Sequence, residues 1–324
     1  MKAMRVHEFG LEHPMRLDEV EDPRPQENEI LVRSLAAGAH PVDVVIRAAK
    51  HPFHKNFTLP YIPGPEAAGD VIAVGAGVKN FRVGQRVCGR CTGGSYAEKV
   101  RMSISWATEL PESYSYAEGA GIVVQFATAW NALVIQAQAG PGETVLIHGG
   151  AGGVGMAALQ LAKTMGCRVI ATAGTRKKCG LCVDLGADRA INYREENFAE
   201  GALKLTEGRG VDVVVDCAAD ANLMNDVDAI RPGGRIVVLG TAKALDEKAA
   251  FGVQRALVKD ARILCMSMPN LTPHLPGLMR RLSSLVSEIH FKIPIYREMK
   301  LAEANAAHEI LWSGEHHGKI VLAP

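Results

Sequence analysis

TVLIHGGAGGVGMAALQLAK, residues 144–163, decides the fold of this chain. Residues 144–148 are apolar and partly β-branched, which predicts a short buried strand. The next residues satisfy the pattern G-x-G-x-x-G with Gly150, Gly152 and Gly155, and good helix formers follow from Met156. In a strand–turn–helix context, such glycines let the backbone approach a pyrophosphate at the start of the helix. The stretch therefore predicts a dinucleotide site, and the alternative is a glycine-rich turn without a ligand.

The segments around this stretch alternate between strand-like and helix-like patterns. Strands are predicted at 168–172, 190–193, 211–216, 235–239 and 263–268. Helices are predicted between them at 177–185, 198–206 and 223–230. Such alternation predicts an α/β fold, a doubly wound parallel sheet with helices on both faces.

The first third of the chain has a different pattern. Short strand-like runs at 29–36, 67–74, 80–88 and 94–100 predict a small twisted barrel, and an alanine-rich, nearly uncharged stretch at 117–139 predicts one or two buried helices. Helices at 276–287 and 301–313 precede a final strand at 319–322, which we expect to pair back into the first domain.

Length and composition limit the classes of protein. A chain of 324 residues with 48% hydrophobic residues predicts a globular protein of two domains. We expect no transmembrane helix and no secretory signal, because no run of about 18 apolar residues exists and residues 1–20 carry dispersed charges. The net charge of +1 argues against a nucleic-acid surface. Seven cysteines without a compact spacing scheme are typical of a reducing compartment, so we expect a cytoplasmic protein.

Two cysteine pairs and two histidine pairs leave a metal site as a weaker alternative. They are Cys88/Cys91, Cys179/Cys182, His51/His54 and His316/His317. The first cysteine pair ends a predicted strand, the second lies on a predicted helix, and the histidine pairs lack an obvious third ligand. We therefore expect no zinc in these places.

Several stretches, taken in order, resemble the medium-chain dehydrogenase/reductase superfamily, and within it the zinc-free quinone oxidoreductases. They include AAGAHPVDVVIR (36–47), PGPEAAGDVIAVGAGVKNFRVGQRV (63–87), GGSYAEKV (93–100), HGGAGGVGMAALQLAK (148–163), PGGRIVVLG (232–240) and AHEILWSGEHHGKIVL (307–322). The resemblance implies a GroES-like catalytic domain at 1–118 and 268–324, a Rossmann domain at 119–267, and a site where the two meet.

The zinc enzymes of this superfamily carry a cysteine near position 38 and Gly-His-Glu near position 65. This chain has Gly38, Ala39 and His40 at the first place and Gly64, Pro65 and Glu66 at the second. Two ligands and the four-cysteine structural lobe are missing, so a tetrahedral site cannot be built, and we expect chemistry without a metal.

The end of the second Rossmann strand predicts which cofactor binds. NAD enzymes place an acid there to bind the ribose hydroxyls. The segment Thr172–Lys178 has no acid and instead carries a hydroxyl and three cations, which favours the 2′-phosphate of NADPH, although a solvated basic helix start fits too. The resemblance implies that Gly174, Thr175, Lys178 and Tyr193 line the phosphate pocket.

Further cofactor contacts follow from the glycine turn, from the strand ends and from the resemblance. Beyond the turn residues Gly152, Gly153, Val154 and Gly155, the set consists of Thr128, Asn222, Leu239, Gly240, Thr241, Met266 and Met268. Lys319 either reaches a phosphate or is a solvated lysine.

The resemblance implies hydride transfer from NADPH to a quinone or to an α,β-unsaturated carbonyl. His40 stands where members often carry asparagine, and Lys50 or His51 stands where enoyl thioester reductases carry a tyrosine acid. His40 is therefore either an acid or polariser, or a hydrogen-bonded loop residue. The alternatives for the whole chain are a metal-free carbonyl reductase and a cofactor-binding structural or regulatory protein.

The apolar run ARILCMSM, residues 261–268, is suited to an exposed edge strand. Because such an edge invites pairing, and because this branch is commonly dimeric, we expect a homodimer.

Overall fold

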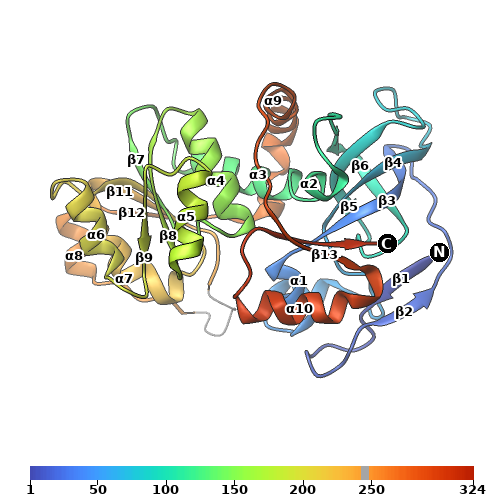
Figure 1. Ribbon diagram of the computed structural model, residues 1–324, viewed down its shortest axis with the longest axis horizontal. Coiled ribbons are helices and arrows are strands. Elements are labelled where there is room, and N and C mark those ends of the chain that lie inside the picture. Colours follow the sequence, from blue (N-terminus) through green and yellow to red (C-terminus); the bar gives the residue numbers. More distant parts are fainter. Residues whose placement is uncertain (242–247) are drawn as a thin grey trace. The chain divides into compact units, whose positions relative to one another are not determined.

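The computed structural model describes residues 1–241 and 248–324. The chain forms two compact units, one of residues 1–127 with 274–324 and one of residues 128–273. Figure 1 labels most helices and strands with numbers that follow chain order.

In the second unit, the described strands form a six-stranded sheet in the order β12-β11-β10-β7-β8-β9, with every pairing parallel. The strands are β7 (Thr144–Ile147), β8 (Arg168–Ala173), β9 (Arg189–Asn192), β10 (Val211–Asp216), β11 (Ile230–Val238) and β12 (Arg262–Cys265). The helices are α4 (Gly153–Thr164), α5 (Arg176–Asp184), α6 (Phe198–Leu205), α7 (Ala219–Ala229) and α8 (Val253–Val258).

The order of the strands creates a switch point between β7 and β10. The chain runs from β7 toward β9 on one side and from β10 toward β12 on the other. Since parallel crossovers are right-handed, the helices of the two halves cover opposite faces, and ligands bind outside the carboxyl ends at the switch point. The predicted α/β class is confirmed, and the glycine turn after β7 lies at this position.

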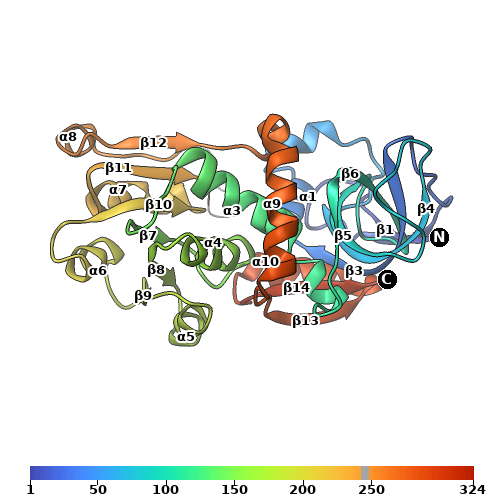
Figure 2. The same cartoon turned by 90° about the horizontal axis from the view of Figure 1, so that it is seen from above.

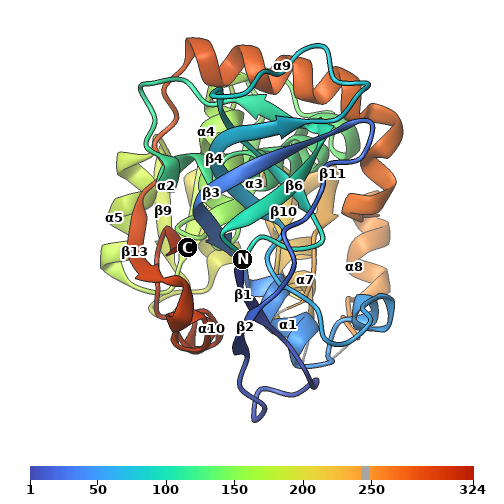
Figure 3. The ribbon, with the colours of Figure 1, turned by 90° about the vertical axis from the view of Figure 1, so that its right-hand side faces the viewer.

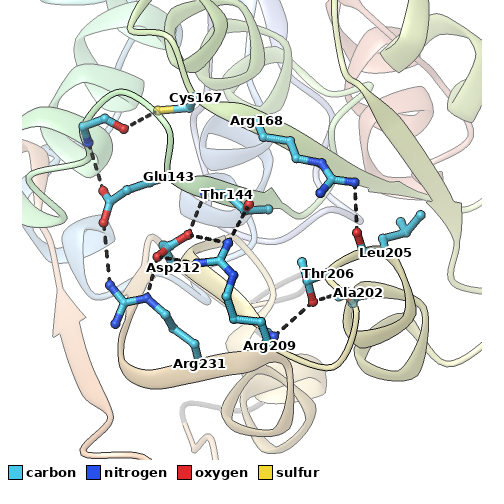
Figure 4. A network of polar contacts seen from close by, with 12 residues as sticks. Glu143, Thr144, Cys167, Arg168, Ala202, Leu205, Thr206, Arg209, Asp212 and Arg231 are labelled. Carbon is cyan, nitrogen blue, oxygen red and sulfur yellow. Dashed lines mark hydrogen bonds and ion pairs between the residues drawn. The ribbon is translucent and has the colours of Figure 1, made fainter.

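A polar network ties the opposite, amino-terminal ends of β7 and β10 together (Figure 4). The buried carboxylate of Asp212 accepts from the Thr144 backbone N–H at 2.7 Å and from the guanidinium groups of Arg209 and Arg231. Arg231 also pairs with Glu143, 3.9 Å away. The hydrogen bonds to Asp212 hold its pKa below the usual value in spite of burial. The network therefore joins β7 to β10 at the end of the sheet that lies opposite the glycine turn.

The first unit is built on a mixed sheet in the order β13-β14-β3-β4-β5-β6 (Figure 3). Its strands are β3 (Glu29–Ala39), β4 (Glu66–Val74), β5 (Arg86–Thr92), β6 (Lys99–Glu109), β13 (Ile295–Lys300) and β14 (Lys319–Ala323), and β1 (Lys2–Arg5) and β2 (Arg16–Glu19) form a separate hairpin. Because β3 pairs with both β4 and β6, these strands close into the expected small barrel. The predicted return of the last strand is confirmed, since β14 pairs antiparallel with β3.

The helices of this unit are α1 (Pro41–Arg47), η1 (Pro52–Asn56), α2 (Tyr116–Gly119), α9 (Leu275–Glu288), η5 (Leu301–Glu303) and α10 (Ala304–Ser313). The helix α3 (Val123–Trp130) begins in the first unit and ends in the second, where the π-helical turns η2 (Asn131–Gln136) follow it and the 3-10 segment η4 (Met268–His274) precedes α9.

One described helical stretch, Tyr116–Gln136, has the length and apolar composition to cross a membrane. Its most apolar window is 67% buried within the structure, as in a core helix. The stretch was predicted as one or two buried helices, and two α-helices followed by π-helical turns are observed.

Some elements escaped the sequence analysis. β13 and the short helices α1 and α8 were not predicted, because their residues show no extended apolar periodicity. The helix predicted at 223–230 is α7, which starts at Ala219 and ends one residue before Ile230, where β11 begins.

The glycine turn yields a prediction on stability. A Cβ at Gly155 would lie 2.2 Å from the Gly149 carbonyl oxygen, whereas a Cβ at Gly180 in α5 meets nothing within 4 Å. We expect Gly155→Ala to lower the free energy of unfolding by more than about 1 kcal/mol through displacement of α4. Gly180→Ala is the control, and it should raise stability by about 0.5–1 kcal/mol because alanine favours the helix. Urea unfolding without cofactor measures both, and equal effects would contradict the packing argument.

Candidate cofactor site and buried cation

The glycine turn leaves the start of α4 open to an anion. Gly152 is the N-cap and provides no side-chain hydrogen bond. The backbone N–H groups of Gly153, Val154 and Gly155 have no intrahelical partner at this position. Of these residues, only Gly155 is fully buried. The helix dipole and these donors together suit a pyrophosphate.

The residues after β8 form a second polar region, which is centred on Gly174. The Thr175 hydroxyl caps α5 by accepting from the Lys178 backbone N–H at 3.2 Å. A Cβ at Gly174 would lie 2.6 Å from the Tyr193 hydroxyl and 3.3 Å from Arg194 Nε, so both side chains lie over this glycine. The structure thus brings together the four residues expected to line a phosphate pocket, with Arg194 beside them.

An acid that the linear sequence does not place near this segment also approaches it. Glu195 pairs with Arg176 at 3.1 Å, and Arg176 is largely exposed. An exposed ion pair of this kind contributes little to stability, and solvent screens it. One of the three cations of the segment is therefore partly neutralised by Glu195.

A cavity of about 440 Å³ lies next to this position. It joins the residues that follow β9 to the first turns of α7. Its lining consists of Tyr193, Arg194, Glu195, Glu196, Asn197, Phe198, Ala221, Asn222 and Asn225. Two residues predicted separately, Tyr193 and Asn222, therefore line one cavity.

The carboxyl ends of β10 and β11 are joined through backbone contacts. The Leu239 N–H donates to the Asp216 carbonyl at 2.7 Å, and the Ala219 N–H donates to the Gly240 carbonyl at 3.1 Å. Leu239, Gly240 and Thr241 are half-exposed there. These residues occupy the strand ends at which open α/β sheets bind ligands.

The structure also brings together Thr128 and Met268, which are 140 positions apart. The Thr128 hydroxyl donates to the Met268 sulfur at 3.3 Å, and both side chains are half-buried. Met266 follows β12, and its N–H donates to the Val238 carbonyl at 3.2 Å.

A buried polar cluster that was not predicted lies at the switch point. His148 follows β7, and its two ring nitrogens lie 2.9 Å from the Thr172 hydroxyl and 2.8 Å from Asp226. Asp216, at the end of β10, binds Asn222 Nδ2 and the Ala218 N–H. The cluster therefore connects the glycine turn to a predicted ribose contact.

Burial shifts both carboxyls of this cluster toward their protonated forms. Burial, together with the Asp226 charge, raises the pKa of Asp216 to about 6, and burial raises the pKa of Asp226 to about 7. Burial lowers the pKa of His148 to about 4, which keeps the ring neutral. Ligand-type atoms of the three residues lie within 4.8 Å of one another. Since both ring nitrogens are already hydrogen-bonded and burial raises the pKa of both carboxyls, we interpret the cluster as a carboxyl pair that titrates near neutral pH.

A second buried cluster lies in the first unit, around His40. The His40 ring nitrogen Nε2 lies 2.8 Å from Lys319 Nζ and 3.3 Å from Glu66 Oε2. The side chains of Lys319 and Glu66 are only 3% and 0% exposed, so the solvated alternative for Lys319 is wrong. Gln125, with its amide oxygen turned toward Lys319, accepts from Nζ at 2.6 Å and donates to Glu66 at 2.8 Å.

Burial and mutual attraction set the charges in this cluster. Burial lowers the pKa of Lys319 to about 8 against the opposing attraction of Glu66 and Asp43, so the ammonium form still prevails at pH 7. Burial raises the pKa of Glu66 to about 7. Burial, followed by the Lys319 charge, holds the pKa of His40 well below its usual value. A neutral imidazole therefore accepts from a buried ammonium.

Position 38 shows that the residues present do not fit the zinc of the related alcohol dehydrogenases. A Cβ at Gly38 would lie 2.8 Å from Lys319 Cε, 2.9 Å from Lys319 Nζ and 2.2 Å from the Ala120 carbonyl. A cysteine at this position would collide with the lysine. Position 65 is occupied by proline, which offers no ligand atom. The ammonium thus occupies space that a metal-ligating side chain would need.

Asp43 contacts the backbone of His40. Its carboxylate accepts from the His40 backbone N–H at 3.0 Å and from the Tyr96 hydroxyl at 3.2 Å. The Tyr96 hydroxyl also lies 3.2 Å from His308 Nε2. These contacts fix the start of α1 and give Asp43 a positioning role.

Comparisons with known proteins agree with this geometry. A model of the alcohol dehydrogenase GroES-like domain matches residues 26–139, and a zinc-binding dehydrogenase model matches residues 153–284. A quinone oxidoreductase of Rattus norvegicus is 32% identical over 326 residues, which cover 99% of this chain and 97% of that protein. The chain belongs to the medium-chain dehydrogenase/reductase superfamily, in its quinone oxidoreductase branch.

Solved structures of this superfamily extend the comparison. The Escherichia coli quinone oxidoreductase, solved in complex with NADPH, has 29% identity and a TM-score of 0.87 over 100% of both chains. A mycobacterial protein, also solved with NADPH, has 28% identity and a TM-score of 0.89 over 100% of both chains.

Within this medium-chain reductase, the sequence analysis missed Glu66, Gln125, His148, Asp216 and Asp226 as members of buried clusters. His148 and Asp216 end mainly apolar predicted strands and Gln125 lies in a nearly uncharged predicted helix, which is a signal of burial, whereas Glu66 and Asp226 carry no such signal. The same signal was available for Lys319, the first residue of an apolar strand. The pattern marks such a residue as buried, but its partners come from distant elements.

The carboxyl pair predicts a pH dependence. A raised pKa stabilises the folded state below the unfolded value near 4, and this stabilisation is lost as the pH rises through about 7. Asp226→Asn removes this titration and retains a partner for His148. We expect the unfolding free energy of the variant, relative to wild type, to be higher at pH 8 than at pH 5 by on the order of 1 kcal/mol or more. Urea unfolding at the two pH values measures it. The titration of His148 contributes to both proteins and cancels in the difference between their unfolding free energies. A difference that is the same at pH 5 and pH 8 would show that Asp226 is ionised in the folded protein.

Proposed function

We propose that this medium-chain reductase transfers a hydride from NADPH to a quinone or an α,β-unsaturated carbonyl without a metal. The observation that carries the proposal is the Lys319 ammonium, which fills the space of a zinc ligand in a chain that retains the dinucleotide turn. Without a Lewis acid, electron-poor acceptors are the ones that need least help from the protein. The relatives named as quinone oxidoreductases support this acceptor class.

The cofactor residues divide into three groups by their place in the second unit. The glycine turn and the start of α4 would hold the pyrophosphate through Gly152, Gly153, Val154 and Gly155. The 2′-phosphate would bind at Gly174, Thr175, Lys178 and Tyr193. Asn222, Leu239, Gly240, Thr241, Thr128, Met266 and Met268 would hold the ribose and the nicotinamide. When bound, NADPH supplies the hydride, and the protein supplies alignment and exclusion of water.

Cofactor preference tests the phosphate pocket. Charge-assisted hydrogen bonds contribute roughly 1.5–3 kcal/mol each, so two bonds partly offset by desolvation give on the order of 100-fold preference for NADPH over NADH. Lys178→Ala should weaken NADPH binding and leave NADH binding within a few-fold. Isothermal titration with both cofactors measures this, and Lys204→Ala, on α6, is a control. Equal dissociation constants in the wild type would refute the pocket.

Turnover tests the reaction. The purified protein should oxidise NADPH in the presence of quinones or enones, contain no stoichiometric zinc by elemental analysis, and keep its rate after chelator treatment. Zinc at one equivalent, with activity lost on chelation, would overturn the metal-free assignment. NADPH that binds but is oxidised by no quinone, enone or ketone would favour a structural or regulatory role.

We also propose that two copies pair through β12. This strand is the edge of the described sheet and pairs only with β11 (Figure 2). Nearby α8 exposes Val253, Leu257 and Val258 at 60%, 64% and 81%. An apolar surface beside an open edge strand is suited to self-association.

Light scattering at micromolar concentration should give twice the mass of 34.7 kDa. The double variant Leu257→Lys and Val258→Lys should shift the mass toward a monomer, because four like charges would face one another in the dimer. Val83→Lys, an exposed substitution at 63% in the first unit, is the control. A monomeric wild type would exclude this pairing.

The seven cysteines all lie among the described residues, and all are free thiols. Free thiols persist in a reducing compartment, which supports the proposed cytoplasmic location.

A further inference from the structure

The reduction of a quinone or an enone needs a proton as well as a hydride. The hydride leaves an oxygen anion on the acceptor, and this anion becomes a hydroxyl by taking up a proton. The groups that could supply it in the first unit are those packed around His40: Lys319 from β14, Glu66 from β4, and Asp43 from α1 with its neighbours Tyr96 and His308.

The contacts join Glu66, Lys319 and His40 into one cluster in which one member is more exposed than the others. Glu66 is fully buried and receives a hydrogen bond from the Val124 N–H at 2.9 Å. Lys319 is held between Gln125 and His40. His40, with its side chain 8% exposed, is the most accessible of Glu66, Lys319 and His40. The imidazole is therefore the least enclosed of the three groups.

We propose that Lys319 is the proton-supplying residue of the reaction and acts through His40. This inference rests on the proposed function. When Nε2 accepts from the ammonium, the neutral ring carries its proton on Nδ1. The Nδ1–H bond breaks as the acceptor's O–H bond forms, and an Nζ–H bond breaks as an Nε2–H bond forms. Lys319 is left as a neutral amine and the ring stays neutral, now with its proton on Nε2. The cycle closes when water gives a proton to Nδ1 and the Nε2 proton returns to Nζ, which restores the ammonium.

The packing around Lys319 shows that the position is built for this side chain. Gly38 leaves room for Cε and Nζ, and a Cβ at Gly121 would already lie 3.5 Å from Lys319 Cγ. Gln125 accepts from the ammonium at 2.6 Å, and Glu66 lies 4.0 Å from the ammonium and 3.3 Å from His40 Nε2. A buried lysine with such partners stays charged near neutral pH and still releases a proton readily, as its pKa of about 8 indicates.

The kinetic test compares Lys319→Met, Lys319→Arg and the exposed control Lys79→Met, with an enone acceptor and saturating NADPH. We expect Lys319→Met to lower kcat about 10²-fold or more with little change in the KM for NADPH. Lys319→Arg keeps the charge but does not release a proton near neutral pH, so it should not restore the rate. In the wild type, kcat should fall above about pH 8, and this limb should be absent in both variants. Lys79→Met should behave as wild type. Rescue by arginine would show that only the charge matters and would overturn the proposal.

A measurement without turnover keeps this inference separate from the proposed function. In protein labelled with ¹⁵N-histidine, the His40 ring should carry its proton on Nδ1 at neutral pH, and its nitrogen shifts should change as Lys319 titrates near pH 8. In Lys319→Met, this step should disappear. A wild type that shows the step but oxidises no NADPH would refute the proposed function and leave the proton link intact. Ring signals that do not change between pH 6 and pH 10 would refute the link itself, and this holds even if Lys319→Met fails to fold.

Discussion

A buried ionisable group must be neutralised or hydrogen-bonded, and this constraint shapes the centre of both units. In the first unit, Lys319, His40, Glu66 and Gln125 satisfy one another without access to water. In the second unit, His148 is hydrogen-bonded at both ring nitrogens, to Thr172 and Asp226, while one oxygen each of Asp216 and Asp226 stays without a partner, which agrees with their raised pKa values. Removing one partner leaves an uncompensated polar group in an apolar surrounding, so each cluster holds its strands in a single arrangement.

The two clusters differ in their relation to chemistry. The carboxyl pair of the second unit connects the end of β7, through His148, with Asn222 on α7, so it fixes a side chain that was predicted to contact the ribose. The cluster of the first unit contains a cation with a lowered pKa against a neutral imidazole, which suits it to moving a proton. Lys319 Nζ lies where a side chain at position 38 would extend, and Gly38 leaves room for it.

The sequence predicted the parts of the structure that local patterns control. Val211–Asp216 and Thr144–Ile147 are strands because they are short, apolar and β-branched, and the glycines after β7 mark the only kind of turn that allows α4 to approach Gly149 so closely. β13, with the sequence IYREMK, is mostly exposed and polar, so its pairing with β14 has no apolar signature.

The site residues show the same limit: local patterns located single residues but not the contacts between distant ones. Tyr193 and Asn222 were predicted separately and line one cavity. The interaction of Lys319 with His40 joins residues 279 positions apart, and no local pattern specifies such a contact. The sequence showed which ligands position 38 and position 65 lack, but only packing shows what replaces them.

Hydride transfer without a metal is the central claim, and an isotope effect tests it most directly. NADPH carrying deuterium at the transferred position of C4 is compared with ordinary NADPH, using zinc-free protein and one quinone or enone that is turned over. The account predicts a lower kcat/KM with the deuterated cofactor and the same value with and without a chelator. Oxidation that requires added zinc, or no oxidation with any such acceptor, would contradict it.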